Sequence, residues 1–255
     1  IMSWYSNLEC RVRWGDTHSD WFGIPAGVRQ GGILSPIFYC LYVDDLDEIL
    51  SAMGIGCHLK ETFLAILLYA DDMALLSPSL NGLQKLISAT EQYCNMWDIM
   101  LNAKKTKNLY FGKKHDPINL RLDGKDIDWV TSWSYLGVVV KSHTSFNCCI
   151  REKVRAFYRS ANGIFRIEGR SNETVMLQLL ETHCLPILSY AIDVIHVAGR
   201  DERRMMRVAY NSLFRKVFKY RPWESVTDLQ HLLQRQTWEE LVEKRRVAFV
   251  SRVKK

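Results

Sequence analysis

The sequence lacks several patterns that define whole classes of protein. No apolar run approaches the roughly 18 residues that a transmembrane helix needs, and the longest, Phe63 to Ala70, has eight. The first residues lack the basic-then-apolar order of a signal peptide, so we expect an intracellular protein without a membrane partner. Seven cysteines, an odd number with no Cys-x-x-Cys spacing, argue against a disulfide framework and a structural zinc site.

The composition instead favours a packed, globular chain with an uneven distribution of charge. Of 255 residues, 47% are hydrophobic, and the net charge is +6. Residues 1–98 hold 5 Lys/Arg against 12 Asp/Glu, whereas residues 99–170 hold 14 against 6 and residues 200–255 hold 15 against 7. An acidic block followed by basic blocks suits a cation site next to a surface that binds a polyanion. Solvated helix faces produce the same pattern, so charge alone does not decide between the two interpretations.

Periodicity predicts mixed structure in the first part of the chain. A glycine-rich loop over residues 27–36 precedes a predicted helix from Ser35, its N-cap, to about residue 50. Residues 62–77 read as a β-hairpin, and residues 81–97 as a helix with Asn81 as a plausible cap. The remaining strand-like pieces lie at residues 9–14, 108–111 and 118–140, the last with a turn at Asp123-Gly124.

Helical patterns take over from about residue 147. Ile150, Val154, Phe157, Ala161 and Ile164 form an apolar stripe with basic residues between them. Further helices are predicted over residues 174–197, with a kink or break at Pro186, and over residues 201–219 and 227–253. The chain is therefore predicted to be α+β, with a mixed domain over residues 1–145 and an all-α domain over residues 146–255.

Two adjacent carboxylates, Asp71 and Asp72, are predicted at the turn of the hairpin between two apolar strands. Carboxylates brought to the end of buried strands need compensation, which a hard cation such as Mg²⁺ provides. The alternative is a solvated Asp-Asp turn. Residues 42–45 have the same Tyr-x-Asp-Asp form but lie in a segment of helical period, so their carboxylates are interpreted as a polar helix face.

At this point the sequence resembles a known family. Tyr69-Ala70-Asp71-Asp72 resembles the central motif of reverse transcriptases, and residues 27–36 (GVRQGGILSP) resemble the motif that precedes it. Leu101-Asn102-x-x-Lys105-Thr106 and Tyr135-Leu136-Gly137 resemble the two that follow, and residues 185–190 (LPILSY) resemble a stretch of non-LTR (LINE-type) retrotransposon enzymes, with Ala191 where glycine is usual. Four motifs in the family's order are far more specific than any one of them.

The resemblance implies an RNA-directed DNA polymerase that transfers nucleotides to a primer 3′-OH by a two-metal mechanism. Residues 1–145 would be a partial palm, an antiparallel sheet with helices, and residues 146–255 the helical thumb with a C-terminal connection. The implied cofactor is Mg²⁺, and the implied partners are RNA template, DNA primer, RNA–DNA hybrid and dNTP. The implied metal ligands are Asp71 and Asp72.

The resemblance implies further roles, residue by residue. Lys105 would approach the leaving pyrophosphate, with Lys104 and Lys107 as competing candidates or the cluster simply a basic surface. Arg29 would contact phosphate or be a surface charge. The residues implied to contact nucleotide and template are Arg29, Gln30, Gly31 and Tyr69. Those implied to contact the primer are Tyr135, Leu136 and Gly137. Those implied to contact the duplex backbone are Arg151, Arg155 and Arg159.

The family also needs an earlier Asp, which Asp16 and Asp20 do not match because they lie in a polar turn. We expect that residue before Ile1, so this chain alone is expected to have an incomplete metal site and little or no activity. Two other interpretations stay open. One is a catalytically inactive, nucleic-acid-binding remnant, and the other is a helical interaction protein built from residues 148–255.

Overall fold

The computed structural model describes residues 8–24, 27–29, 31–112, 118–143, 147–168, 172–195 and 199–253. The chain forms two compact units, one of residues 1–106 with 118–127 and the other of residues 107–117 with 128–255. Helices and small antiparallel sheets make up the described part, as expected for the predicted α+β class. The division at residue 145 into palm and thumb stays a prediction. None of the described helices is long and apolar enough to span a membrane.

The first unit begins with a ribbon of short strands. The predicted strand over residues 9–14 is two strands, β1 and β2, which pair with β4 and β3 on the way back. Gly15 turns the ribbon with a φ of +61°, a conformation that glycine adopts without steric cost. The four strands are β1 (Glu9–Cys10), β2 (Arg13–Trp14), β3 (Thr17–His18) and β4 (Phe22–Gly23).

Two helices then lead into two hairpins and a long helix. Helix α3 packs against β7 and helix α4 against β8, so the second hairpin is supported from its strands rather than from its turn. The core between them is formed by Leu46, Leu50, Ala65, Ile66, Leu86, Tyr93 and Cys94. The elements are α2 (Ser35–Tyr42), α3 (Asp44–Ala52), β5 (Cys57–Leu59), β6 (Thr62–Leu64), β7 (Ile66–Tyr69), β8 (Asp72–Leu75) and α4 (Leu80–Met96). The unit also holds the small hairpin of β9 (Arg121–Leu122) and β10 (Lys125–Asp126).

Three local predictions in this unit were wrong in detail. The helix predicted from residue 35 to residue 50 is broken at Val43, which adopts φ −110° and ψ 8° between α2 and α3. Ser35 is the first helical residue rather than the N-cap, and its hydroxyl donates to the Arg29 carbonyl oxygen instead. Ser79, not Asn81, caps α4 by accepting a hydrogen bond of 3.1 Å from the Gly82 amide.

The second unit begins with a three-stranded antiparallel sheet of β11 (Ser132–Tyr135), β12 (Val138–Lys141) and β13 (Asn147–Cys149). Tyr135 pairs with Val138, so β11 and β12 are joined by a two-residue turn. The strand predicted over residues 108–111 is reduced to one parallel bridge between Asn108 and Trp129. The remaining sheet leads directly into the helical part.

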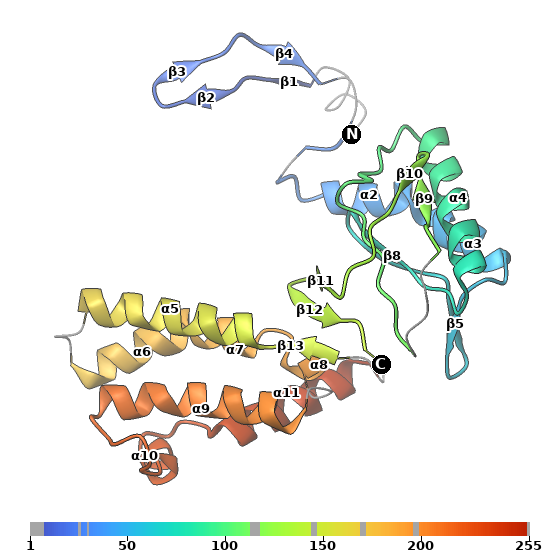
Figure 1. Cartoon of the computed structure of the whole chain (residues 1–255). Helices are drawn as coiled ribbons and strands as arrows, with labels where there is room; N and C mark the ends of the chain where they lie inside the picture. The colour runs from blue at the N-terminus through green and yellow to red at the C-terminus, as the bar shows by residue number, and fades with distance from the viewer. Residues whose placement is uncertain are drawn as a thin grey trace. The chain divides into compact units, whose positions relative to one another are not determined.

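The helices of this unit share one apolar core. Helix α5 packs on α6, α7 and α9, and Figure 1 shows α5, α6 and α9 running side by side. The predicted stripe on α5 is confirmed, since Ile150, Val154, Phe157 and Ala161 are buried and Ile164 packs against the same core. The helices are α5 (Arg151–Glu168), α6 (Glu173–His183), α7 (Leu185–Ser189), α8 (Ile192–Ile195), α9 (Arg200–Val217), α10 (Thr227–Leu232) and α11 (Trp238–Val253).

Two of the long helices predicted here are divided in the structure. Residues 174–197 contain α6, α7 and α8, with Pro186 in the first turn of α7, where its missing amide costs no hydrogen bond. Residues 227–253 contain α10 and α11. The predicted break at Pro186 is thus confirmed as the start of a new helix.

Candidate functional site

The predicted hairpin with carboxylates at its turn is confirmed. Strands β7 and β8 pair in register from Ile66 with Leu75 to Tyr69 with Asp72, which leaves Ala70 and Asp71 as the turn. Ala70 adopts a φ of +50°, in the left-handed region that is rare for residues with a Cβ. Asp71 and Asp72 are both exposed, and Tyr69 is 64% exposed. The strands are anchored in the core, and the polar end of the hairpin is presented to solvent.

Helix α2 contributes a tyrosine next to this turn that the sequence did not single out. Burial raises the pKa of the half-buried Tyr39 phenol, and the negative charge of Asp71 raises it further. An electrostatic effect of this kind requires the two groups to be close. Tyr39 therefore lies within electrostatic range of the Asp71 carboxylate, with a hydroxyl able to donate a hydrogen bond.

The donor chemistry of the turn suits a hard divalent cation. Carboxylate oxygens are the ligands that Mg²⁺ prefers, and neither side chain forms an ion pair within the described residues. However, no group of three or more His, Cys, Asp or Glu side chains that could hold a metal occurs in the described part of the chain. The described residues thus offer two carboxylate ligands of the right type.

The second Tyr-x-Asp-Asp sequence, at residues 42–45, serves the packing of the first unit. Tyr42 and Trp97 stack edge to face with ring centroids 5.2 Å apart, and the Tyr93 phenol donates to the Tyr42 carbonyl oxygen at 3.1 Å. Asp44 and Asp45 are exposed in the first turn of α3, where a negative charge favours the helix dipole. The prediction that Asp44 and Asp45 belong to a polar helix face is confirmed, but they lie at the start of a helix rather than within one.

The glycine-rich loop before α2 folds around one carbonyl group. The Arg29 oxygen accepts from the Ser35 hydroxyl at 2.5 Å and from the Gly32 amide at 3.1 Å. A Cβ on Gly32 would lie 2.6 Å from the Ser35 hydroxyl oxygen, so a side chain here would displace that hydroxyl from its hydrogen bond with Arg29. Gly31 has a φ of +78°, and the Arg29 side chain is exposed. Gln30 lies outside the described residues.

The contacts of the side chains differ among the three clustered lysines, Lys104, Lys105 and Lys107. Lys107 forms an ion pair of 2.5 Å with Asp128, and only 17% of its side chain is exposed. Lys105 is exposed, and its amide donates at 3.1 Å to both the carbonyl and the side-chain oxygen of Asn102. Lys104 is also exposed. Lys107 is thus the least available candidate of the three, and no contact among the described residues joins Lys105 to the carboxylates.

The remaining predicted site residues lie in the second unit. Leu136 and Gly137 form the turn between β11 and β12, with φ values of +47° and +72°. Arg151, Arg155 and Arg159 are exposed on α5, and their spacing of four residues places them along one face, away from the buried stripe. Lys153, which the sequence placed among the basic residues of α5, is half-buried instead.

Comparison with known protein families identifies the family to which the chain belongs. The model of the family "Reverse transcriptase (RNA-dependent DNA polymerase)" matches residues 1–140, and the chain belongs to this family. The predicted kinship with enzymes of non-LTR retrotransposons is confirmed by the relatives below.

Three curated relatives come from insect mobile elements. The chain is 25% identical over 210 residues to the RNA-directed DNA polymerase from mobile element jockey of Drosophila funebris, covering 78% of this chain and 22% of that protein. It is 25% identical over 268 residues to the probable RNA-directed DNA polymerase from transposon BS of Drosophila melanogaster, covering 100% and 29%. It is 25% identical over 166 residues to the probable RNA-directed DNA polymerase from transposon X-element of the same species, covering 61% and 18%. The chain thus spans less than a third of each relative's length.

Sequence reasoning missed three residues around these sites. Tyr39 was overlooked, although it lies four residues after Ser35 in the helix that follows the glycine-rich loop. Tyr190 was noted only as part of a motif, and Lys153 only as one of several basic residues. The signal for Tyr190 was available, because a motif residue without an assigned role is a candidate for positioning another motif.

Proposed function

We propose that this chain is the palm-and-thumb portion of an RNA-directed DNA polymerase from a non-LTR retrotransposon. The observation that carries the proposal is the exposed pair of Asp71 and Asp72 at the turn of a hairpin whose strands are anchored in a core. Membership of the reverse transcriptase family supports it. The proposed substrates are a DNA primer on an RNA template and dNTPs, which favour an intracellular location.

The residues at the turn would hold and orient the reacting groups. Asp71 and Asp72 would bind Mg²⁺, which when bound neutralises phosphate charge and favours ionisation of the attacking hydroxyl. Lys105, exposed and without an ion pair among the described residues, would donate a proton to the leaving pyrophosphate. The Gly31 backbone, without a side chain, would let a nucleotide approach closely.

The second unit would hold the nucleic acid. The Tyr135–Gly137 turn would press on the primer strand, and Arg151, Arg155 and Arg159 on α5 would contact the backbone of the RNA–DNA hybrid. Contacts between arginine and phosphate are independent of base sequence. They weaken as the salt concentration rises, because the release of counterions from the nucleic acid then becomes less favourable. This arrangement also fits a nucleic-acid-binding remnant without catalysis, because the described residues supply only two carboxylates, Asp71 and Asp72, to the metal site.

The metal-binding part of the proposal is tested without relying on catalysis by this chain. Fe²⁺ with ascorbate and peroxide generates hydroxyl radicals where the ion binds, and these cut the nearby backbone. We expect cleavage close to residues 69–72 in the wild-type chain, competed by Mg²⁺ and lost in the Asp71→Asn and Asp72→Asn double variant.

The matched control is the Asp44→Asn and Asp45→Asn double variant, which removes the same charge from the similar sequence at the start of α3. It is expected to keep the cleavage at residues 69–72. Cleavage that survives in the Asp71 and Asp72 variant, or that disappears in both variants, would overturn the proposed ligands. Primer extension on an RNA template with Mg²⁺ is the second measurement. Robust incorporation that Asp71→Asn abolishes would show that the chain polymerises by itself.

A further inference from the structure

The segment Leu185–Tyr190 resembles a family motif and has no role in the function proposed above. In the structure it forms α7 and ends at Tyr190, which follows the last helical residue. The Tyr190 side chain reaches the turn between β11 and β12. We propose that Tyr190 is a positioning residue that holds the Leu136–Gly137 turn in the shape that receives the primer end. This inference rests on the proposed polymerase function.

The turn has a conformation that needs support. Positive φ values at both central residues are the mark of the type I′ turn, which fits the twist of a tight hairpin. Such turns favour Asn-Gly or Gly-Gly, because a residue with a Cβ is strained in the left-handed region. Gly137 meets this demand at +72°, but Leu136, at +47°, does not. A contact outside the hairpin is therefore needed to favour this shape over its alternatives.

Tyr190 makes that contact. Its phenol donates a hydrogen bond of 2.8 Å to the carbonyl oxygen of Leu136, the residue that is strained. The ring also lies against the next residue, since a Cβ built on Gly137 would be 3.1 Å from Cε1 of Tyr190. Tyr190 therefore contacts both central residues of the turn, from a segment more than fifty residues away in the sequence.

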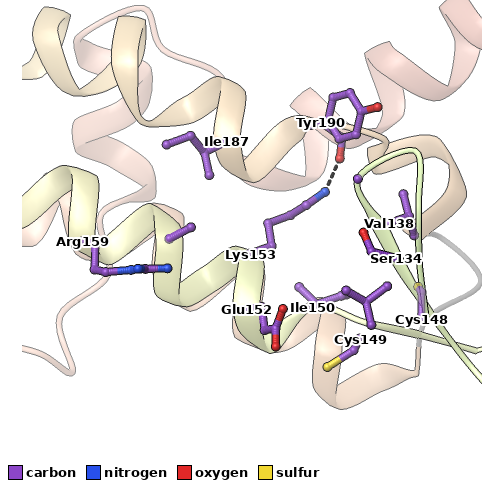
Figure 2. A pocket seen from close by; sticks show the side chains of 13 residues that line it. Ser134, Val138, Cys148, Cys149, Ile150, Glu152, Lys153, Arg159, Ile187 and Tyr190 are labelled. Atoms are coloured by element: carbon purple, nitrogen blue, oxygen red, sulfur yellow. Dashed lines mark hydrogen bonds between the residues drawn. The ribbon is translucent and has the colours of Figure 1, made fainter. Parts of the chain in front are cut away.

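Tyr190 is itself held by two elements. Its amide donates to the Pro186 carbonyl oxygen at 3.0 Å, which fixes it to α7. Lys153 of α5 donates to the Tyr190 carbonyl oxygen, and its Nζ lies 5.4 Å from the centre of the Tyr190 ring. Figure 2 shows the Lys153 side chain extending from α5 to this oxygen. The turn is thus connected through one tyrosine to two helices.

A cavity next to the turn increases the importance of this connection. A space of about 430 Å³ lies between the sheet and α5, and its lining includes Gly137, Val138, Ile150, Lys153 and Tyr190. Side chains that line a cavity have fewer packing contacts on that side. The hydrogen bond from Tyr190 therefore has little close packing to replace it if it is removed.

The test compares Tyr190→Phe with the wild-type chain, because this change removes only the hydroxyl. The first measurement is hydrogen–deuterium exchange of peptides covering residues 132–141. Loss of one neutral hydrogen bond corresponds to roughly a 2- to 12-fold effect, and we expect exchange at the turn to accelerate within that range. The matched control is Tyr220→Phe, an exposed tyrosine of the same unit whose phenol makes no hydrogen bond among the described residues.

The second measurement is affinity for an RNA–DNA hybrid with a recessed primer end and for a blunt hybrid of equal length. Tyr190→Phe is expected to lower the preference for the recessed end by a similar factor and to leave the affinity for the blunt hybrid unchanged. A general loss of folding would reduce both affinities. If the wild-type chain binds neither hybrid, the proposed function fails. If it prefers the recessed end and Tyr190→Phe does too, only the present inference fails.

A substitution in the turn provides the rescue. Leu136→Asn places Asn-Gly at the two central positions, which favours the type I′ turn by itself. In that background Tyr190→Phe is expected to change neither the exchange rate of residues 132–141 nor the ratio of the two affinities. An undiminished effect would show that Tyr190 acts in another way than through the conformation of the turn.

Discussion

The Tyr42 phenol donates a hydrogen bond of 2.6 Å to the carbonyl oxygen of Trp97, and so joins the end of α2 to the end of α4. Tyr69, at the equivalent place in the other Tyr-x-Asp-Asp sequence, is 64% exposed. Tyr42→Phe is therefore expected to lower the free energy of unfolding by about 1 kcal/mol, and Tyr69→Phe to leave it unchanged. Urea unfolding of the two variants checks this. Equal losses of stability would contradict the distinction between the two sequences.

Lys107 and Lys105 are expected to respond differently to the same substitution. The Lys107 side chain is 17% exposed and forms an ion pair with Asp128. Lys107→Met breaks this pair and should cost roughly 0.5–1 kcal/mol of stability. Lys105→Met should cost nothing measurable in stability, because Lys105 is exposed. In an active form of the enzyme, Lys105→Met should lower the rate of nucleotide incorporation and Lys107→Met should not. The reverse result would assign proton donation to Lys107.

The arginines of α5 should determine the salt dependence of hybrid binding. Each phosphate contact that is lost lowers the slope of log K against log salt by about 0.7–0.9. Arg155→Ala is expected to reduce the slope by roughly that amount, measured by filter binding at several salt concentrations. Arg245→Ala on α11 removes the same charge from another exposed position and serves as the control. A wild-type slope near zero would favour a helical interaction protein instead.

Ala191, which stands where the family usually has glycine, has a φ of +51°. The left-handed conformation costs an alanine roughly 1–2 kcal/mol, and glycine loses about 0.5–1 kcal/mol through its larger unfolded-state entropy. Ala191→Gly is therefore expected to stabilise the chain by about 0.5–1 kcal/mol. Ala248→Gly, in the exposed part of helix α11, should destabilise it by about 1 kcal/mol. Thermal unfolding of both variants measures whether each gains or loses stability. A loss of stability from Ala191→Gly would contradict the structure at this turn.

Lys153 should make stability depend on pH. Burial lowers the pKa of its ammonium group to about 8, against the weaker, opposite effect of Cys148. The folded state then binds the proton less tightly than the unfolded state, whose lysine titrates near 10.5. The resulting penalty is full below pH 8 and disappears as the pH rises toward 10.5.

The wild-type chain should therefore gain stability relative to Lys153→Met between pH 8 and pH 10. Taking the difference between the two proteins removes the titration of other groups to first order. The titratable and charged side chains that share the cavity with Lys153 are those of Cys148, Cys149, Glu152, Arg159 and Tyr190. A difference that is constant over this range would show that Lys153 has an ordinary pKa.

Much of this molecule was predictable because its signals are local. The apolar stretches on both sides of Asp71 and Asp72 predicted the hairpin, and the stripe from Ile150 to Ile164 predicted the buried face of α5. Helix ends were less predictable. The cap at Ser79 was missed because Asn81, two residues further on, has an equally suitable side chain. The break at Val43 involves no capping side chain, so the residue type gave no signal for it.

The sequence by itself determined the family, the α+β class and the position of two carboxylates at a turn, since each depends on residue order and spacing. Only the tertiary structure decided which Tyr-x-Asp-Asp has its tyrosine hydrogen-bonded to another helix end, which lysine is occupied by an ion pair, and what holds the Leu136–Gly137 turn. The physical reason is the same in each case. Trp97 is more than fifty residues from Tyr42 and Tyr190 more than fifty from Leu136, so these hydrogen bonds exist only once the helices have packed.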